Sequence, residues 1–274
     1  MIVLVTGGSS GIGHATVLRL ARGGHQVFAA SRDPERAPLP DSVIPLVLDV
    51  ASVDSAHRAV EAVVARAGGL DALVNNAGIG SLSPVEETPE EEAHRVLEVN
   101  FFGPLRLARL AIPVMRARGG GRIVNVTSTN DVLPAPFGGF YSASKAALTS
   151  ASYVLGAEVA ASGIRVTVVA PGLFRTAMAD ELGRRAVDPA SLYRTALERL
   201  RHADGERLAA AGDPDQVAAA VEECLLSDDP PARVVVGADA EGFERLLKNA
   251  SPEELAAMLR DYVAQMSEPG PAGL

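Results

Sequence analysis

Short apolar runs that alternate with helical patterns are the feature that most restricts how this chain can fold. The runs are rich in Val, Ile and Ala, which is typical of strands buried on both faces of a sheet. Helical patterns between them supply the crossovers that parallel strands need. We therefore predict an α/β fold in which a doubly wound, parallel, seven-stranded sheet is formed by residues 2–5, 26–30, 44–48, 72–75, 122–127, 165–170 and 233–236.

Several helix starts carry their own signals. Ser52 is placed to cap the helix that follows it, and Thr88-Pro-Glu-Glu91 is a capping box with Pro89 at the first helical position. Asp213 and Ser251 begin stretches of the same arrangement. Residues 33–43 contain three prolines, so the second crossover should have a short helix or none.

The chain is predicted to form one domain, residues 1–274, with no repeat and no linker. Residues 172–212 follow the sixth strand and contain helical pieces without a strand, which fits a lid over a substrate site. A purely structural helical excursion is the alternative. Residues 241–274 form a C-terminal helical extension, with a helix at 252–266 that would block or extend contacts between subunits.

Composition excludes several classes of function. The net charge of −9 argues against a nucleic-acid partner, which needs clustered positive charge. No apolar run is long enough to span a membrane, and the start MIVLVTGG is too short for a secretory signal. The single Cys224 fits a reducing compartment, and the five scattered histidines do not suggest a metal site. We expect a cytoplasmic protein without a metal.

A glycine-rich turn, Thr6-Gly-Gly-Ser-Ser-Gly-Ile-Gly13, joins the first strand to the first helix. Such a turn brings backbone amides and a helix N-terminus close to a pyrophosphate, as in Rossmann-type folds. Its spacing differs from Gly-x-Gly-x-x-Gly, and a tight strand-to-helix connection would need no ligand. The turn nevertheless favours nucleotide binding.

Tyr141 and Lys145 lie about one helical turn apart in FYSASKAAL, so they should share a helix face. An ammonium lowers the pKa of a neighbouring phenol, which then becomes a usable general acid or base near neutral pH. Alone, the pair could equally be an ordinary helix surface. Motifs elsewhere in the chain are needed to choose between the catalytic and the surface interpretation of this pair.

Six motifs in one order resemble those of the short-chain dehydrogenase/reductase family. They are the TGxxxGxG turn, Asp49-Val50 after the third strand, Asn75-Asn76-Ala77-Gly78, Asn100, Ser128 thirteen residues before Tyr141, and Pro171-Gly172 with Thr176. The phrases PVEET and VLEVNFFGPLRLAR look most like the hydroxysteroid and retinol dehydrogenase branch. The truncated second crossover departs from the family near the adenosine.

The resemblance implies hydride transfer between a nicotinamide and a carbonyl or alcohol carbon. Tyr141 would exchange the proton, Lys145 would lower its pKa and bind the nicotinamide ribose, and Ser128 would polarise the substrate oxygen. Asn100 would hold a water on the proton path. The implied cofactor-binding residues are Gly7, Ser9, Ser10, Gly11, Ile12, Gly13, Ser31, Arg32, Asp49, Val50, Asn76, Ala77, Gly78, Tyr141, Lys145, Pro171, Gly172, Phe174 and Thr176.

The end of the second strand predicts NADP(H) rather than NAD(H). An NAD site of this type needs a carboxylate there to hold the ribose hydroxyls. Here Ser31 offers a hydroxyl and Arg32 a guanidinium that can grip a 2′-phosphate. Asp33 comes one or two residues late and precedes a proline, so we interpret it as a cap.

The substrate pocket is expected to be apolar, with walls from loops 79–82, 131–140 and 173–182. Its bulky candidates are Phe137, Phe140, Phe174 and Met178, each of which could instead be core. These predictions indicate a carbonyl reductase for a ketone or secondary alcohol of moderate size. A non-catalytic dinucleotide-binding regulator and an NAD-dependent alcohol dehydrogenase are the alternatives. Helical regions 101–118 and 141–161 suggest a homodimer or homotetramer.

Overall fold

The computed structural model describes residues 1–178, 180, 186–209, 211–238, 240, 242 and 250–268. Its centre is one parallel sheet of seven strands in the order β3-β2-β1-β4-β5-β6-β7. The predicted fold class is confirmed. The strands are β1 (Ile2–Thr6), β2 (Gln26–Ser31), β3 (Val43–Val47), β4 (Ala72–Asn75), β5 (Gly121–Val126), β6 (Ile164–Pro171) and β7 (Arg233–Val236).

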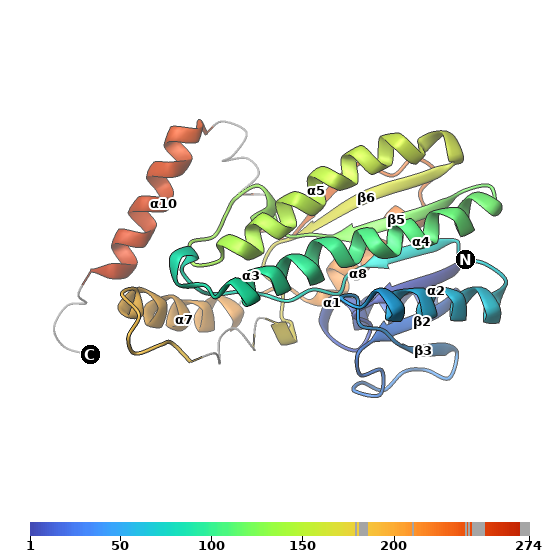
Figure 1. Cartoon of the computed structure of the whole chain (residues 1–274), viewed down its shortest axis with the longest axis horizontal. Coiled ribbons are helices and arrows are strands. Elements are labelled where there is room, and N and C mark those ends of the chain that lie inside the picture. Colours follow the sequence, from blue (N-terminus) through green and yellow to red (C-terminus); the bar gives the residue numbers. More distant parts are fainter. Residues whose placement is uncertain are drawn as a thin grey trace.

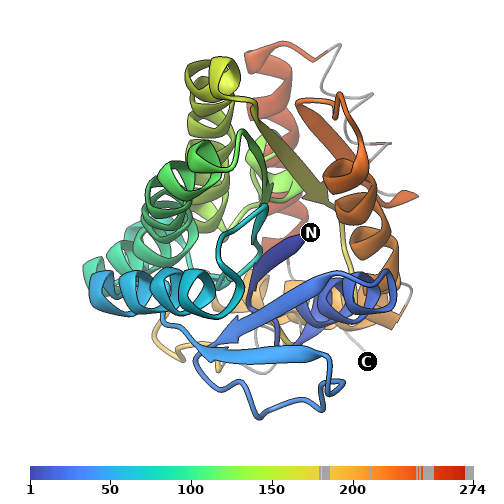
Figure 2. The ribbon, with the colours of Figure 1, turned by 90° about the vertical axis from the view of Figure 1, so that its right-hand side faces the viewer.

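Helices cover both faces of this sheet (Figures 1 and 2). On one face lie α1 (Gly11–Arg22) and α8 (Pro214–Leu226), which pack against each other. On the other face lie α2 (Val53–Ala67), α4 (Gly103–Ala117) and α5 (Gly139–Val159). The remaining elements are α3 (Glu90–Leu97), α7 (Arg194–Ala209), α10 (Pro252–Ser267), the short turns η1 (Val85–Glu87), η3 (Thr129–Asp131) and η4 (Ala160–Ser162), and the π-helical turn η2 (Glu98–Phe102).

Strand β1 shows why the apolar runs form the sheet. Val3, Leu4 and Val5 have no exposed surface. Leu4 packs into the core beneath α2 and α4, whereas Val3 and Val5 pack into the core beneath α1 and α8. Side chains alternate between the faces of a strand, so an unbroken apolar run is what a doubly covered strand requires.

The order of the strands reverses beside β1, where β2 leads to one side and β4 to the other. Loops after the carboxyl ends of β1 and β4 therefore separate and leave a crevice, the place where doubly wound folds bind ligands. The predicted cofactor residues other than Tyr141 and Lys145 lie at or just after the carboxyl ends of β1, β2, β3, β4 and β6, and Ser128 follows β5. The topology therefore gathers them at one end of the sheet.

Helix starts agree with the sequence in three cases and differ in one. Ser52, Asp213 and Ser251 cap α2, α8 and α10, and Ser251 forms a full capping box with Glu254. The predicted capping box at Thr88 is wrong. Helix α3 begins at Glu90, and the Thr88 hydroxyl donates a hydrogen bond back to the Pro84 carbonyl, at 2.7 Å, which closes η1. Residues 33–42 contain no helix, as their prolines predict.

Candidate active site

The glycine turn after β1 brings two stretches of backbone unusually close. Gly7 has a φ of +69°, a conformation that favours glycine. A Cβ on Gly13 would lie 2.2 Å from the Gly7 carbonyl oxygen, so any other residue there would push the turn open. Thr6 fixes the turn to the loop that follows the neighbouring strand β4, because its hydroxyl accepts hydrogen bonds from the Asn76 and Ala77 amides, each at 2.9 Å.

A cleft of about 1480 Å³ starts at this turn. The predicted cofactor and catalytic residues that line it are Gly7, Ser10, Gly11, Ile12, Arg32, Asn76, Ala77, Gly78, Ser128, Tyr141, Lys145, Pro171, Gly172, Phe174 and Thr176. Ser9, Gly13, Ser31, Asp49 and Val50 are not in its lining. Asp49 instead accepts a hydrogen bond from the Ala51 amide at 3.0 Å, and Val50 packs in the core.

The end of β2 places two guanidinium groups at the cleft. Arg32 lines it as the sequence indicates, and Arg36 lines it as well. Both side chains are exposed. Between strand and arginines, the Ser31 hydroxyl is buried and has no hydrogen-bond partner among the described residues. Sequence analysis missed Arg36 because it lies in a proline-rich loop whose course has no periodic pattern.

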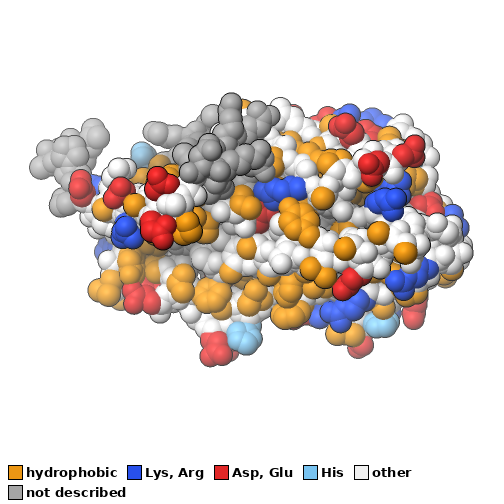
Figure 3. Space-filling model, turned by 90° about the horizontal axis from the view of Figure 1, so that it is seen from above, with side chains coloured by type: hydrophobic (Ala, Val, Ile, Leu, Met, Phe, Trp, Pro, Cys, Tyr) orange, Lys and Arg blue, Asp and Glu red, His pale blue; other side chains and the backbone are white. Residues whose placement is uncertain are grey.

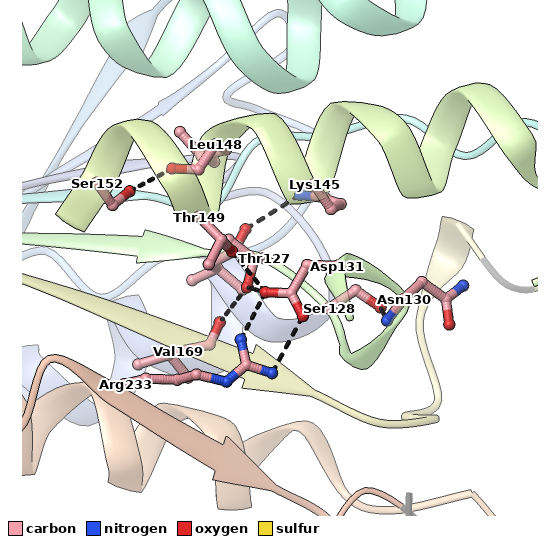
Figure 4. Close-up of polar contacts among 11 residues, drawn as sticks. Thr127, Ser128, Asn130, Asp131, Lys145, Leu148, Thr149, Ser152, Val169 and Arg233 are labelled. Atoms are coloured by element: carbon pink, nitrogen blue, oxygen red, sulfur yellow. Dashed lines mark hydrogen bonds and ion pairs between the residues drawn. The ribbon is translucent and has the colours of Figure 1, made fainter. Parts of the chain in front are cut away.

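Ser128, Tyr141 and Lys145 converge on the middle of the cleft. Ser128 lies two residues after the end of β5 and caps η3, and its hydroxyl accepts a hydrogen bond from the Asn130 amide at 3.2 Å (Figure 4). Lys145 is 4% exposed and donates to the Val126 carbonyl at 3.0 Å. Its ammonium nitrogen lies 5.8 Å from the centroid of the Tyr141 ring.

The pKa of Tyr141 is raised above its ordinary value, contrary to the sequence-based prediction. Burial is the main cause, because it disfavours the charged phenolate. A hydrogen bond with Ser128 opposes this effect, and the negative charge of Asp131 adds to it. The expected lowering by Lys145 is not among the causes of the shift, and within the described structure the only opposing effect comes from Ser128. At neutral pH the phenol is therefore protonated.

Burial acts on Lys145 in the opposite direction, because its charged form is the protonated one. The pKa of the ammonium is lowered to about 8, while the Asp131 carboxylate pulls it back upward. Lys145 is thus mainly an ammonium at neutral pH, but it loses its charge as the pH rises through about 8. Its charge can change within the pH range in which enzymes work.

Asn100 lies at the π-helical turn between α3 and α4 and has no exposed surface. Its amide nitrogen donates to the Ile79 carbonyl and to the Ser144 hydroxyl, at 2.9 and 3.1 Å. Its oxygen accepts from the Ile79 amide at 2.9 Å. Both amide hydrogens are therefore used in holding the loop after β4 against α5. A water on Asn100 would have to donate to the remaining lone pair of its oxygen, and that role stays a prediction.

The four bulky substrate candidates divide into two pairs. Met178 and Phe174 line the cleft, although Phe174 is 3% exposed and mostly packs into the core. Phe137 does not face it: its ring is buried against α7 and stacks edge-on with Tyr193. Phe140 is also outside the lining. Of the predicted third wall, 173–182, Ala179, Glu181 and Leu182 lie outside the described residues.

Sequence analysis included α7 in the predicted lid, residues 172–212, but missed α10 as a wall of the cleft. Leu200 and Arg201 of α7 and Met258, Leu259 and Tyr262 of α10 line its outer part. Helix α10 rests on α7 through an apolar cluster that includes Leu197, Val263 and Met266. The signal was the spacing of Leu255, Leu259, Tyr262 and Met266, which repeats at helical intervals on one side.

Comparison with known proteins gives consistent matches. A family model described as short chain dehydrogenase matches residues 1–186. The chain is 34% identical over 241 residues to 3-ketodihydrosphingosine reductase of Bacteroides thetaiotaomicron, covering 86% of this chain and 87% of that protein.

Two solved structures extend the likeness to nearly the whole chain. A short-chain dehydrogenase from Streptomyces avermitilis is 33% identical with a TM-score of 0.78, over 97% of this chain and 98% of that one. A short chain dehydrogenase from Burkholderia cenocepacia, determined in complex with NADP, is 30% identical with a TM-score of 0.71, over 94% and 96% of the two chains.

Proposed function

This chain belongs to the short-chain dehydrogenase family, and we propose that it is an NADP(H)-dependent reductase of apolar ketones of moderate size. The observation that carries the proposal is the meeting of Ser128, Tyr141 and Lys145 in the cleft that begins at the glycine turn. The named relative from Bacteroides is itself a reductase of a ketone, which supports the direction of the reaction.

The residues present fit a nicotinamide dinucleotide. The close approach of Gly7 and Gly13 leaves room for a phosphate against the N-terminus of α1. Arg32 and Arg36 suit a 2′-phosphate, and the buried hydroxyl of Ser31 is a polar group that a ribose phosphate could engage. The cleft is larger than the 300–1,000 Å³ or so that one small ligand needs, which suits a cofactor and a substrate together.

The nicotinamide, when bound, would supply or accept the hydride. Ser128 would donate a hydrogen bond to the substrate oxygen, and Tyr141 would give it a proton as it becomes an alkoxide. Because the pKa of Tyr141 is raised, the phenol holds its proton at neutral pH, which suits reduction rather than oxidation. Lys145 would bind the ribose and stabilise the phenolate that remains.

The substrate would occupy the outer part of the cleft. Met178 and the α10 residues Met258, Leu259 and Tyr262 offer it an apolar wall. We expect segment 172–212, which contains α7, to act as a lid, and α10 packs against α7. These features suit a ketone with an extended apolar portion. The resemblance to the hydroxysteroid and retinol branch stays a prediction.

Membrane insertion has no candidate segment: within the described part of the chain, no helix is long and apolar enough to cross a bilayer.

For assembly we keep the prediction of a homo-oligomer paired through α4 and α5. These helices border a groove of about 400 Å³ lined by Leu105, Val154 and Leu155. Figure 3 looks onto the α5 side and shows hydrophobic side chains among charged ones. Light scattering of wild type and Val154→Glu would test the pairing.

A screen of NADPH oxidation against ketones of increasing apolar length tests the proposed function. We expect turnover with at least one apolar ketone and a lower KM for NADPH than for NADH. Ser128→Ala should lose this turnover while it still binds NADPH. Cofactor binding without turnover of any ketone would favour the regulator, and a lower KM for NADH would favour the NAD-dependent alternative.

A further inference from the structure

A buried carboxylate stands directly behind the catalytic residues. Asp131 is the last residue of η3, three positions after Ser128, and its side chain has no exposed surface. Arg233 of β7 donates two hydrogen bonds to it, at 2.6 and 3.0 Å. The hydroxyls of Thr127 and Thr149 donate to the same carboxylate (Figure 4). Within the described structure the carboxylate thus accepts four hydrogen bonds.

These contacts join the parts of the fold that carry the catalytic groups. Thr127 directly follows the last residue of β5 and immediately precedes Ser128. Thr149 lies on α5, four residues after Lys145 and therefore on the same helix face. Arg233 reaches in from β7, which pairs with β6. One carboxylate therefore connects the turn that holds Ser128, the helix that holds Tyr141 and Lys145, and the outermost strand.

A buried ion pair is a poor device for stability alone. Removing two charges from water costs several kcal/mol per ion, and apolar side chains of similar volume often serve as well or better. Arg233 has only 14% of its side chain exposed, so both partners bear this cost. The hydrogen bonds that Asp131 accepts offset this desolvation cost. Because the ion pair lies beside the catalytic residues, the charge of Asp131 can act on them.

Asp131 is also the charge that acts on both titratable catalytic groups. It raises the pKa of Lys145 and that of Tyr141. In the described structure, the other titratable or charged groups near Lys145 are Tyr141 from its own helix and Arg233, which lies behind Asp131. From the remaining elements packed against it, Gly78, Asn100 and the Val126 carbonyl are uncharged.

We propose that Asp131, held in place by Arg233, is a positioning residue that fixes Ser128 against α5 and supplies the buried negative charge that keeps Lys145 an ammonium. The proposal deepens the proposed function, because it assigns the support of the same catalytic centre. Its central measurement needs no substrate, so it can be decided whether or not turnover is found.

The chain contains two lysines, Lys145 and Lys248, which makes a direct titration possible. Protein grown with lysine labelled with ¹³C at Cε should give two lysine resonances, and Lys248→Arg would identify that of Lys145. We expect a midpoint of about 8 for Lys145 in wild type. Asp131→Asn, which keeps the shape, should lower the midpoint by up to about one unit.

Asp71→Asn is the matched control. It breaks another ion pair, that of Asp71 with Arg118, at the opposite end of β4 from the site. This variant should leave the Lys145 midpoint in place. If Asp131→Asn does not fold, Arg233→Gln decides instead: it removes the positive member of the pair and should raise the midpoint. An unchanged midpoint in folded Asp131→Asn, or in Arg233→Gln when that variant decides, would overturn the proposal.

Kinetics test the positioning role once a ketone substrate is known. A displaced Ser128 should reduce kcat about 10- to 100-fold with little change in the KM for NADPH. Unchanged kcat in Asp131→Asn would overturn the positioning part. Wild type that oxidises NADPH with no ketone would count against the proposed function instead, and the lysine titration would still decide the electrostatic part.

Discussion

Ser128, Tyr141 and Lys145 lie on elements next to the sheet, where hydrogen bonds hold Ser128 and Lys145. The outer wall of the same cleft, in contrast, consists of α7 and α10 packed on each other through apolar side chains. The inner region uses short distances, such as 3.0 Å from Lys145 to the Val126 carbonyl. The outer region uses an apolar cluster at the edge of the fold. Proton transfer requires groups fixed at hydrogen-bonding distances, as in the inner region. Binding the apolar part of a substrate requires only an apolar wall, as in the outer region.

The strongest test of this contrast is to remove the acid from the inner region. Tyr141→Phe should lower kcat by about 10²–10⁴-fold, because general acid catalysis is lost while the ring still fills its place. NADPH affinity, measured by fluorescence titration, should change little. Tyr153→Phe is the control, since Tyr153 lies on the same helix but is 45% exposed. Tyr141→Phe activity within about tenfold of wild type would show that the proton comes from elsewhere.

The next largest effect is expected at the cofactor end. Arg32→Ala should raise the KM for NADPH about 10- to 100-fold, because a charge-assisted hydrogen bond contributes roughly 1.5–3 kcal/mol. The KM for NADH should stay nearly constant, since that cofactor lacks the 2′-phosphate. Arg58→Ala, an exposed arginine of α2, is the control. Equal changes for both cofactors would mean that Arg32 does not recognise the phosphate.

The inner region and the fold were largely predictable because their signals are local. The seven strands follow from apolar runs, and the bounds of β4 and β7 agree residue for residue with the prediction. Tyr141 and Lys145 can be recognised as a pair because both lie within one stretch of five residues. The Asp131–Arg233 pair joins residues 102 positions apart and depends on strand order, so no spacing could reveal it. The predicted direction of the Tyr141 pKa shift was wrong, because the shift is caused mainly by burial, and burial depends on the whole fold.

The outer region shows the same limit from another side. Helix α10 was predicted in place and in capping, yet its contact with the cleft depends on packing against α7. An amphipathic pattern tells which face is buried but not against what. Phe137 is the converse case: its loop made it a candidate for either a substrate contact or the core, and its ring is buried under α7.

The pH dependence sharpens the contrast, because it should belong to the inner region alone. The pKa of Lys145 is lowered to about 8, so its positive charge is complete below that pH and is lost as the pH rises through it. Tyr141, with a raised pKa, stays protonated over this range. For reduction, kcat/KM should therefore fall above about pH 8, approaching tenfold per unit.

Lys145→Arg provides the check on that assignment. An arginine stays charged at all these pH values, so the remaining activity should show no descending limb near pH 8. Lys248→Arg should leave the profile as in wild type. A wild-type profile that stays flat well above pH 8, or a limb that survives in Lys145→Arg, would assign the titration to another group.

The smallest effect is expected at the outer wall, and it should depend on the substrate. Leu259 lines the cleft, so Leu259→Ala removes apolar contact from the far portion of a long ketone. Losing a few methylenes of contact should raise the KM of long ketones by about threefold to tenfold. A short ketone, which does not reach α10, should keep its kcat and KM.

Gln265→Ala is the matched control, because Gln265 lies exposed on α10 and outside the cleft lining. It separates contact with substrate from a general loosening of the helix. Equal losses in Leu259→Ala for short and long ketones would mean that α10 supports the inner region after all. In that case the two regions would act as one, since α7 and the loop around Phe137 would transmit packing from α10 to the turn that holds Ser128.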